Sequence, residues 1–284
     1  MPRARSAAAR VTIHDLAHMA ASGRRIVAVT AYTAAEARCC DDAGADLILV
    51  GDSLGRVVLG LPDELGVTME DMERHTAAVA RGARRALTAA DLPFLAYQAD
   101  PAEAVRNAGR LVRAGAAAVK IEGGAGRVET VRRILDAGIP VIGHLGFTPQ
   151  SIRRFGGPRV QARGEAEAAS LLADARALAA AGCSAIVLEM VPAAVAAQVT
   201  RSVSPPTIGI GAGAGCAGQI LVLYDVVGLS ERRPRFARPY ADLAQGMRDA
   251  VAAYARDVRA GTFPGPEHTH DGRSWGGPAE EAQR

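Results

Sequence analysis

The chain alternates short apolar segments with longer stretches rich in Ala, Leu and Arg, and this alternation constrains its fold more than any other feature. Eight apolar segments cover residues 26–32, 45–50, 92–97, 117–121, 139–146, 184–189, 206–211 and 219–229. The first has the continuous apolar character of a strand that is buried on both faces, as strands of a parallel sheet covered by helices are. The pattern therefore predicts repeated strand–helix units.

The intervals between the apolar segments have helical periodicity. Residues 101–116 and 165–182 are amphipathic, and each pattern reaches a glycine at its end, where glycine often follows the last turn of a helix. Eight such units favour a single-domain α/β fold, the (β/α)8 TIM barrel, and a doubly wound open sheet is the alternative. A further amphipathic helix over residues 241–261 is expected to pack on the outside.

The two ends of the chain differ in composition from the repeating part. Residues 1–10 are basic and rich in alanine with no apolar segment after them, so we expect a flexible arm rather than a signal peptide. The catalytic barrel is expected over residues 11–265, and residues 266–284 are expected to form a disordered tail. No run of apolar residues is long enough to predict a membrane-spanning helix.

Composition excludes further classes of function. The 284 residues include 33 Lys or Arg and 30 Asp or Glu, and the arginines are interspersed with acids, so no basic stripe indicates a nucleic-acid partner. Four cysteines without C-x-x-C spacing are expected to be reduced thiols of a cytoplasmic protein. Lysine occurs only once, at Lys120, in a chain that otherwise uses arginine.

Polar residues lie near the carboxyl ends of several predicted strands, the edge that forms the mouth of a barrel. They are Asp52 and Ser53 after the second segment, Lys120 and Glu122 at the fourth, His144 in the fifth, Glu189 in the sixth, and Asp91 just before the third. Carboxylates that converge in a low-dielectric mouth raise one another's pKa, and a hard divalent cation offsets this cost. Oxygen ligands favour Mg²⁺ over zinc, so Asp52, Asp91 and Glu122 are predicted metal ligands. Each acid alone could equally cap a helix or form a surface ion pair.

Lys120 and Glu122 alternate with Ile121, so on a strand both side chains point to the same side. An inward lysine is a compact charge suited to a substrate carboxylate or a developing enolate. The alternative for Lys120 is an ordinary surface lysine, although arginine is the usual surface cation of this chain. His144 is either a buried structural imidazole or a substrate-binding residue.

Two glycine-containing motifs can be interpreted in more than one way. Residues 51–55 match both the G-x-S-x-G pattern and a GDSL-type hydrolase pattern, but an elbow serine needs Asp and then His later in the chain. The only Asp-x-x-His pair is Asp15–His18, which precedes Ser53. Residues 209–215 could hold an anion with backbone N–H groups or could form a close-packed turn.

At these motifs the sequence resembles the ketopantoate hydroxymethyltransferase (3-methyl-2-oxobutanoate hydroxymethyltransferase) family. The matching stretches are residues 30–32, 49–55, 75–83, 90–97, 114–124, 140–151, 185–192, 206–213 and 263–269. The spacing between them also matches, without large insertions, over residues 11–270.

The resemblance implies a Mg²⁺-dependent TIM-barrel enzyme of pantothenate biosynthesis. Such an enzyme transfers a hydroxymethyl group from 5,10-methylenetetrahydrofolate to the 2-oxoacid 3-methyl-2-oxobutanoate, through a metal-stabilised enolate, and gives 2-dehydropantoate. It implies metal-associated roles for Asp52, Asp91 and Glu122. The positions that match the oxoacid-binding residues are Asp52, Ser53, Asp91 and Lys120, and Glu189 matches the proton acceptor. The resemblance further implies a homo-oligomer, a decamer of stacked pentameric rings.

The sequence departs from the family pattern at six positions, which are Thr33, Gly66, Arg74, Pro158, Ala162 and Ala217. These departures leave open a paralogue that acts on another 2-oxoacid. A Mg²⁺-dependent lyase or mutase of the phosphoenolpyruvate mutase/isocitrate lyase type is the nearest rival enzyme, since it shares enolate chemistry on a 2-oxoacid. A non-catalytic assembly subunit is the rival from outside the enzymes.

Overall fold

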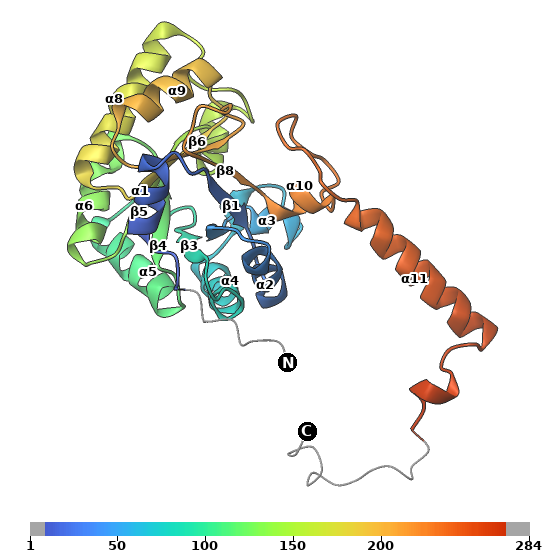
Figure 1. Ribbon diagram of the computed structural model, residues 1–284. Coiled ribbons are helices and arrows are strands. Elements are labelled where there is room, and N and C mark those ends of the chain that lie inside the picture. The colour runs from blue at the N-terminus through green and yellow to red at the C-terminus, as the bar shows by residue number, and fades with distance from the viewer. Residues whose placement is uncertain (1–8, 271–284) are drawn as a thin grey trace.

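The structure is a computed structural model that describes residues 9–270. Eight parallel strands form one closed barrel in sequence order, and helices surround it (Figure 1). This confirms the predicted (β/α)8 barrel and excludes the open sheet. The expectations of a flexible arm at 1–10 and a disordered tail at 266–284 concern residues that lie mostly outside the described range.

The strands are short, and their ends define the two rims of the barrel. They are β1 (Ile26–Thr30), β2 (Leu47–Val50), β3 (Leu87–Asp91), β4 (Ala118–Glu122), β5 (Val141–Gly146), β6 (Ala185–Glu189), β7 (Thr207–Ile210) and β8 (Gly218–Leu221). The barrel closes where Ile26 of β1 pairs with Gly218 of β8. Gly218 lies in close contact with β1, because an added Cβ would stand 2.6 Å from the carbonyl oxygen of Ile26.

The third strand was wrongly predicted at residues 92–97. It is Leu87–Asp91, whose last residue pairs with Lys120 of β4. Residues 92–97 form turns instead, since Pro93 has no N–H to donate and Leu95 has a φ of 66°. The correction moves Asp91 to the carboxyl end of a strand, level with the other predicted site residues.

Helices form over both stretches for which helical periodicity predicted them. The helices of the structure are α1 (Ile13–Ala21), α2 (Ala34–Asp42), α3 (Leu54–Val57), α4 (Met69–Gly82), α5 (Pro101–Arg113), α6 (Val128–Asp136), α7 (Ile152–Phe155), α8 (Glu165–Ala181), α9 (Ala193–Ser202), α10 (Leu223–Val227) and α11 (Leu243–Ala260). Short 3-10 turns are η1 (Glu64–Gly66), η2 (Ala125–Arg127), η3 (Pro149–Ser151) and η4 (Pro266–His268). Asp100 caps α5 by accepting from the Ala102 N–H, and α8 ends at Gly182 in the left-handed region, as its glycine predicts.

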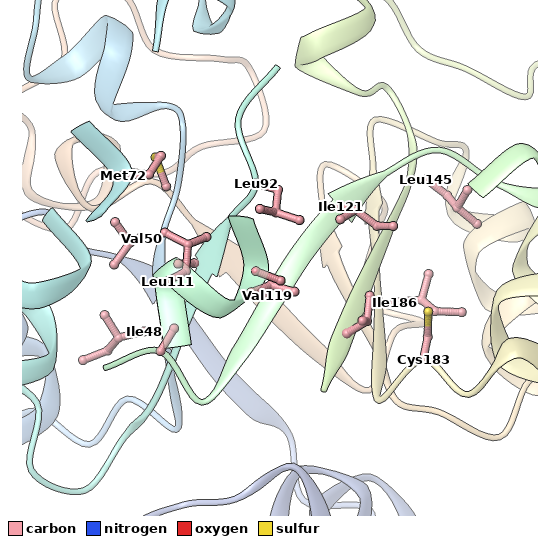
Figure 2. Close-up of a cluster of buried hydrophobic side chains, with 14 of the residues drawn as sticks. Ile48, Val50, Met72, Leu92, Leu111, Val119, Ile121, Leu145, Cys183 and Ile186 are labelled. Atoms are coloured by element: carbon pink, nitrogen blue, oxygen red, sulfur yellow. The ribbon is translucent and has the colours of Figure 1, made fainter. Parts of the chain in front are cut away.

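The core has two layers because successive strand residues point to opposite faces. In β2, Leu47 and Leu49 face the barrel interior, whereas Ile48 and Val50 face the helices. Figure 2 shows side chains of the outer layer, including Ile48 and Val50. Inside the barrel the corresponding positions of β3 and β4 include alanines, and these small side chains explain why β3 has a weak apolar pattern.

The helix expected over residues 241–261 forms as α11, but the prediction that it packs on the barrel was wrong. No residue of α11 is buried, and Figure 1 shows it standing away from the barrel. One face carries an exposed apolar stripe of Leu243, Met247, Val251, Tyr254 and Val258. Among the described helices, none has the length and apolar character required to cross a membrane.

The outer surface of β1 and β8 is open as well. Val27 of β1 is 55% exposed, although a strand residue of a barrel normally lies under a helix. A groove of about 690 Å³ lies along both strands and extends to Tyr240, just before α11. The barrel therefore has an uncovered apolar face, and α11 has an unpartnered one.

Candidate active site

A cavity of about 730 Å³ opens at the carboxyl ends of the strands. Its lining includes all seven residues predicted from the sequence, which are Asp52, Ser53, Asp91, Lys120, Glu122, His144 and Glu189. They come from five successive strands, β2 to β6, or from the residues just after them. The barrel thus brings together side chains that are far apart in the sequence.

Lys120 lies among the carboxylates and is buried. Its Nζ is 3.1 Å from Asp91 Oδ1 and 3.8 Å from Glu122 Oε1. Burial opposes the charged form of the lysine, but the negative charges of Asp91, Glu122 and Asp52 outweigh it and raise its pKa. Lys120 is therefore a fully charged ammonium inside the cavity and not a surface lysine.

His144 links the two sides of the cavity. Its Nδ1 lies 3.2 Å from Glu122 Oε1 and 3.1 Å from Lys120 Nζ, while its Nε2 lies 3.3 Å from Glu189 Oε2. Burial and the charge of Lys120 lower the pKa of the imidazole, but the contacts with Glu122 and Glu189 outweigh them and raise it. His144 therefore lies between Glu122 and Glu189, in contact with both carboxylates, although its Nε2 forms no hydrogen bond.

Asp52 follows β2 and is held from two directions. Its backbone N–H donates to Asp91 Oδ2 over 3.1 Å, and its Oδ2 accepts from Gln150 Nε2 over 2.8 Å. Burial and the charges of Asp91 and Glu122 raise the pKa of Asp52 well above its usual range. Its carboxylate is thus costly to ionise unless a cation is close.

Two polar residues that sequence reasoning missed hold the carboxylates in position. Gln150, in η3, donates its backbone N–H to Glu122 Oε2 and its side chain to Asp52. Tyr97 donates its hydroxyl to Gln150 Oε1 and accepts from the Glu122 N–H. Both lie in stretches that carried the family resemblance, and this was the only signal in the sequence that could have singled them out.

Ser53 does not have the partners of a hydrolase nucleophile. Its Oγ lies 2.9 Å from the Tyr32 hydroxyl, whose pKa is raised by burial. No histidine contacts Ser53 in the part of the chain that the structure describes. Asp15 instead forms the capping box of α1, a helix that packs against the interior layer below the site. These contacts argue against the hydrolase alternative.

The carboxylate set fits a hard cation in its chemistry. Asp91 Oδ1 and Glu122 Oε1 are buried without a hydrogen bond. Four carboxylates, including Glu189, face Lys120 and His144, so negative charge is in excess. Within residues 9–270, however, no three His, Cys, Asp or Glu side chains are grouped closely enough to hold a metal ion as they stand. A bound cation would therefore require the carboxylates to turn toward it.

The glycine run at residues 209–215 packs closely against its surroundings. A Cβ at Gly213 would stand 2.5 Å from the Ala193 side chain, and one at Gly215 would stand 2.8 Å from Ala197. Both alanines belong to α9, so the run lets this helix approach β7 and β8. These contacts favour the close-packed turn over the anion-binding alternative.

Comparison with known proteins identifies the family of the chain. The family model described as "Ketopantoate hydroxymethyltransferase" matches residues 10–266. The chain belongs to this family.

Curated relatives in this family align along most of their length. A protein of Pyrobaculum islandicum named 3-methyl-2-oxobutanoate hydroxymethyltransferase is 56% identical over 84% of this chain and 92% of its own. A protein of the same name from Chloroflexus aurantiacus is 54% identical over 92% of both chains.

Solved structures of distant proteins share the fold. A phosphonomutase from Burkholderia cenocepacia, described as putative, superposes with a TM-score of 0.63 at 17% identity and covers 86% of this chain and 99% of that chain. A 2,3-dimethylmalate lyase of the PEP mutase/isocitrate lyase superfamily superposes with a TM-score of 0.57 at 17% identity, covering 92% of both chains. At such identities they support the barrel and nothing more specific.

Proposed function

We propose that the protein transfers a hydroxymethyl group from 5,10-methylenetetrahydrofolate to 3-methyl-2-oxobutanoate and gives 2-dehydropantoate. The observation that carries this proposal is the arrangement of Lys120, His144 and Glu189 beside the carboxylates in one cavity of a family member. Such a cavity offers a cation for a substrate carboxylate, a candidate base and oxygen ligands for a metal ion.

Asp52, Asp91 and Glu122 are the residues that would hold Mg²⁺. When bound, Mg²⁺ supplies Lewis-acid polarisation of the 2-oxoacid and thereby lowers the pKa of its C3–H bond. Burial raises the pKa of Asp52 and of Asp91, which supports this assignment because a bound cation offsets the cost of ionising them.

The chain's own residues then move the proton. Lys120 holds the substrate carboxylate with its ammonium group, assisted by Ser53 at the edge of the site. Glu189 lines the cavity with a side chain that is 14% exposed, and it accepts the C3 proton while its carboxylate lies 3.3 Å from His144. The C3 carbon then attacks the one-carbon unit of the folate, and water supplies the hydroxyl oxygen. Both bonds from that unit to the folate nitrogens break, and tetrahydrofolate leaves with the C3 proton and one proton of the water on these nitrogens.

A deuterium-exchange experiment tests this chemistry without the folate. Wild-type protein with Mg²⁺ and 3-methyl-2-oxobutanoate in D₂O should exchange the C3 proton, followed by NMR, and Glu189→Gln should slow exchange by about 10²–10⁴-fold. Glu167→Gln, on the outer helix α8, is a matched control. Absence of exchange in the wild-type protein would contradict the proposal.

The same assay extended with 5,10-methylenetetrahydrofolate separates the rival functions. Formation of 2-dehydropantoate supports the transferase, whereas exchange without transfer favours a related lyase, a mutase or a paralogue for another 2-oxoacid. Of the six departures from the family pattern, only Pro158 lines the cavity in the described part of the chain. The site residues are thus little affected by these departures, which supports 3-methyl-2-oxobutanoate as substrate and argues against a non-catalytic subunit.

We also propose that the protein is a homo-oligomer, with a decamer as the expected size. The apolar stripe of α11 and the uncovered face of β1 and β8 support association with a second copy, because each leaves apolar surface in water. Met247→Glu/Val251→Glu should reduce the mass measured by light scattering. Gln245→Glu/Ala252→Glu, on the opposite face of α11, should leave it unchanged. A monomeric wild-type protein would contradict this.

We propose a cytoplasmic location as well. All four cysteines (Cys39, Cys40, Cys183 and Cys216) are free thiols, which supports a reducing compartment.

A further inference from the structure

A segment between α10 and α11 forms part of the cavity rim. Arg232, Arg233 and Arg235 line the cavity while remaining exposed to solvent. Phe236 holds the segment on the barrel, because its ring packs against Gly211, which has a φ of 61° and where a Cβ would stand only 2.7 Å from the ring. The segment is therefore placed over the mouth by a specific contact.

Negative and positive side chains lie at different depths of the cavity. The deep part contains the carboxylates with Lys120, and the rim contains arginines. Arg56, also in the lining, already pairs with Glu64 over 2.9 Å. Arg232, Arg233 and Arg235 make no ion pair or side-chain hydrogen bond with any residue in the described range. Three uncompensated guanidinium groups thus face the entrance.

The clustering of these arginines beside the cavity sets them apart from the rest of the chain, since exposed arginines elsewhere, such as Arg132 and Arg133, also form no ion pair within the described range. Arg110, in contrast, pairs with Glu70 and Glu73 on α4, as expected where arginines and acids are interspersed. The rim segment instead places three arginines within four positions with Glu231 as the only neighbouring acid. Such clustering leaves net positive charge in a concave site, which favours an anionic ligand.

The cavity is larger than the oxoacid requires. Its volume of about 730 Å³ is in the range of pockets for drug-sized ligands, whereas the oxoacid has only five carbons and is expected in the deep part. Folates are longer molecules that end in glutamate residues, and each glutamate carries carboxylate groups. Guanidinium groups bind carboxylates in planar, two-point contacts.

We propose that Arg232, Arg233 and Arg235 bind the glutamate carboxylates of the folate co-substrate and give the enzyme a preference for folates with several glutamates. This inference rests on the proposed function, because it assumes a folate co-substrate. Phe236 follows Arg235 in the chain, and its apolar ring also lines the cavity. The one-carbon unit would then point inward, toward Glu189.

Kinetics with two co-substrates tests the proposal. In the wild-type protein the KM for 5,10-methylenetetrahydropteroyl triglutamate should be about tenfold below that for the monoglutamate, since each extra carboxylate adds a charge-assisted contact. The preference should weaken as salt is added, because the arginines are exposed. In Arg232→Gln/Arg233→Gln/Arg235→Gln the two KM values should converge, with the change in the KM for the folate and not in that for the oxoacid.

Arg132→Gln/Arg133→Gln is the matched control, since both arginines are exposed on α6 and outside the cavity. Failure of wild-type C3 exchange would overturn the proposed function and this inference with it. If exchange and transfer occur but the wild-type protein shows no salt-dependent preference for the triglutamate, only the inference is overturned. The inference is also overturned if Arg232→Gln/Arg233→Gln/Arg235→Gln prefers the triglutamate as strongly as Arg132→Gln/Arg133→Gln does.

Discussion

Carboxylates are buried at both ends of the barrel, but the two ends differ in how these carboxylates are paired. Near the amino ends of the strands, Asp41 accepts from the backbone N–H groups of Arg84, Arg85 and Ala86 over 2.6–2.9 Å. Asp46 accepts from the Val27 N–H, and its other oxygen accepts from Arg24. Both carboxylates are thus fully paired, as buried charges of a stable fold should be.

At the mouth, by contrast, buried carboxylates share too few cations. Asp91 and Glu122 both face the single ammonium of Lys120, and burial raises the pKa of Asp52 and of Asp91. Groups in this condition reduce the stability of the folded state. The comparison indicates that charges at the amino end stabilise the barrel, whereas charges at the mouth lower its stability, as expected if they bind the proposed ligand. The predictions below are ordered from the largest expected effect to the smallest.

Lys120→Arg should lower turnover by about 100-fold or more even though it conserves the charge. A planar guanidinium cannot replace a compact ammonium that is packed between Asp91 and His144. Steady-state kinetics measures the effect, and a melting curve checks that the variant is folded. Near wild-type turnover would show that the lone lysine of the chain has no special role.

Asp41→Asn should lower the free energy of unfolding by about 2 kcal/mol and leave turnover unchanged. Burial alone would raise the pKa of Asp41, but the N–H groups of Arg85, Ala86 and Arg84 outweigh burial and lower it. Its contribution is therefore complete above the unfolded-state pKa and is lost as pH falls through the lower folded-state pKa. Urea denaturation at pH 7 and at acid pH should show a difference between variant and wild type that shrinks in acid. An equal difference at both pH values would contradict the assignment.

Asp52→Asn should increase stability, whereas Asp41→Asn should decrease it. In protein freed of divalent cations with EDTA, it should raise the free energy of unfolding by about 1 kcal/mol, because it removes a buried charge that Asp91 and Glu122 repel. The amide oxygen can still accept from Gln150. Turnover with Mg²⁺ should fall sharply. If Asp52→Asn destabilised the protein as much as Asp41→Asn, carboxylates at the mouth and at the amino end of the barrel would contribute alike to stability, which would contradict the comparison.

Arg24→Gln should have the smallest effect, below about 1 kcal/mol. The Arg24 side chain is 60% exposed, so its ion pair with Asp46 is screened by water, and Asp46 keeps its bond from the Val27 N–H. Thermal unfolding at low and high salt measures the change. A loss as large as that in Asp41→Asn would show that the exposed arginine and not the backbone stabilises the amino end.

Much of the fold and site could be predicted from the sequence because the relevant patterns are local. Apolar runs with helical intervals predicted the closed barrel, and polar residues at strand ends predicted seven of the side chains that line the cavity. The prediction failed at β3, where the alanines of residues 87–91 make a weak apolar pattern and the following loop a strong one. Small residues suffice inside a barrel, where neighbouring strands leave little space.

The sequence by itself determined the succession of strands and helices and the kinds of charge at the mouth, since these depend on hydrophobic periodicity and side-chain chemistry. Only the tertiary structure decided which charges are paired. Gln150 reaches Asp52 across 98 positions, and Asp41 finds its donors more than 40 positions away. It also decided that α11 leaves the barrel, because an amphipathic pattern specifies an apolar face but not the surface that covers it.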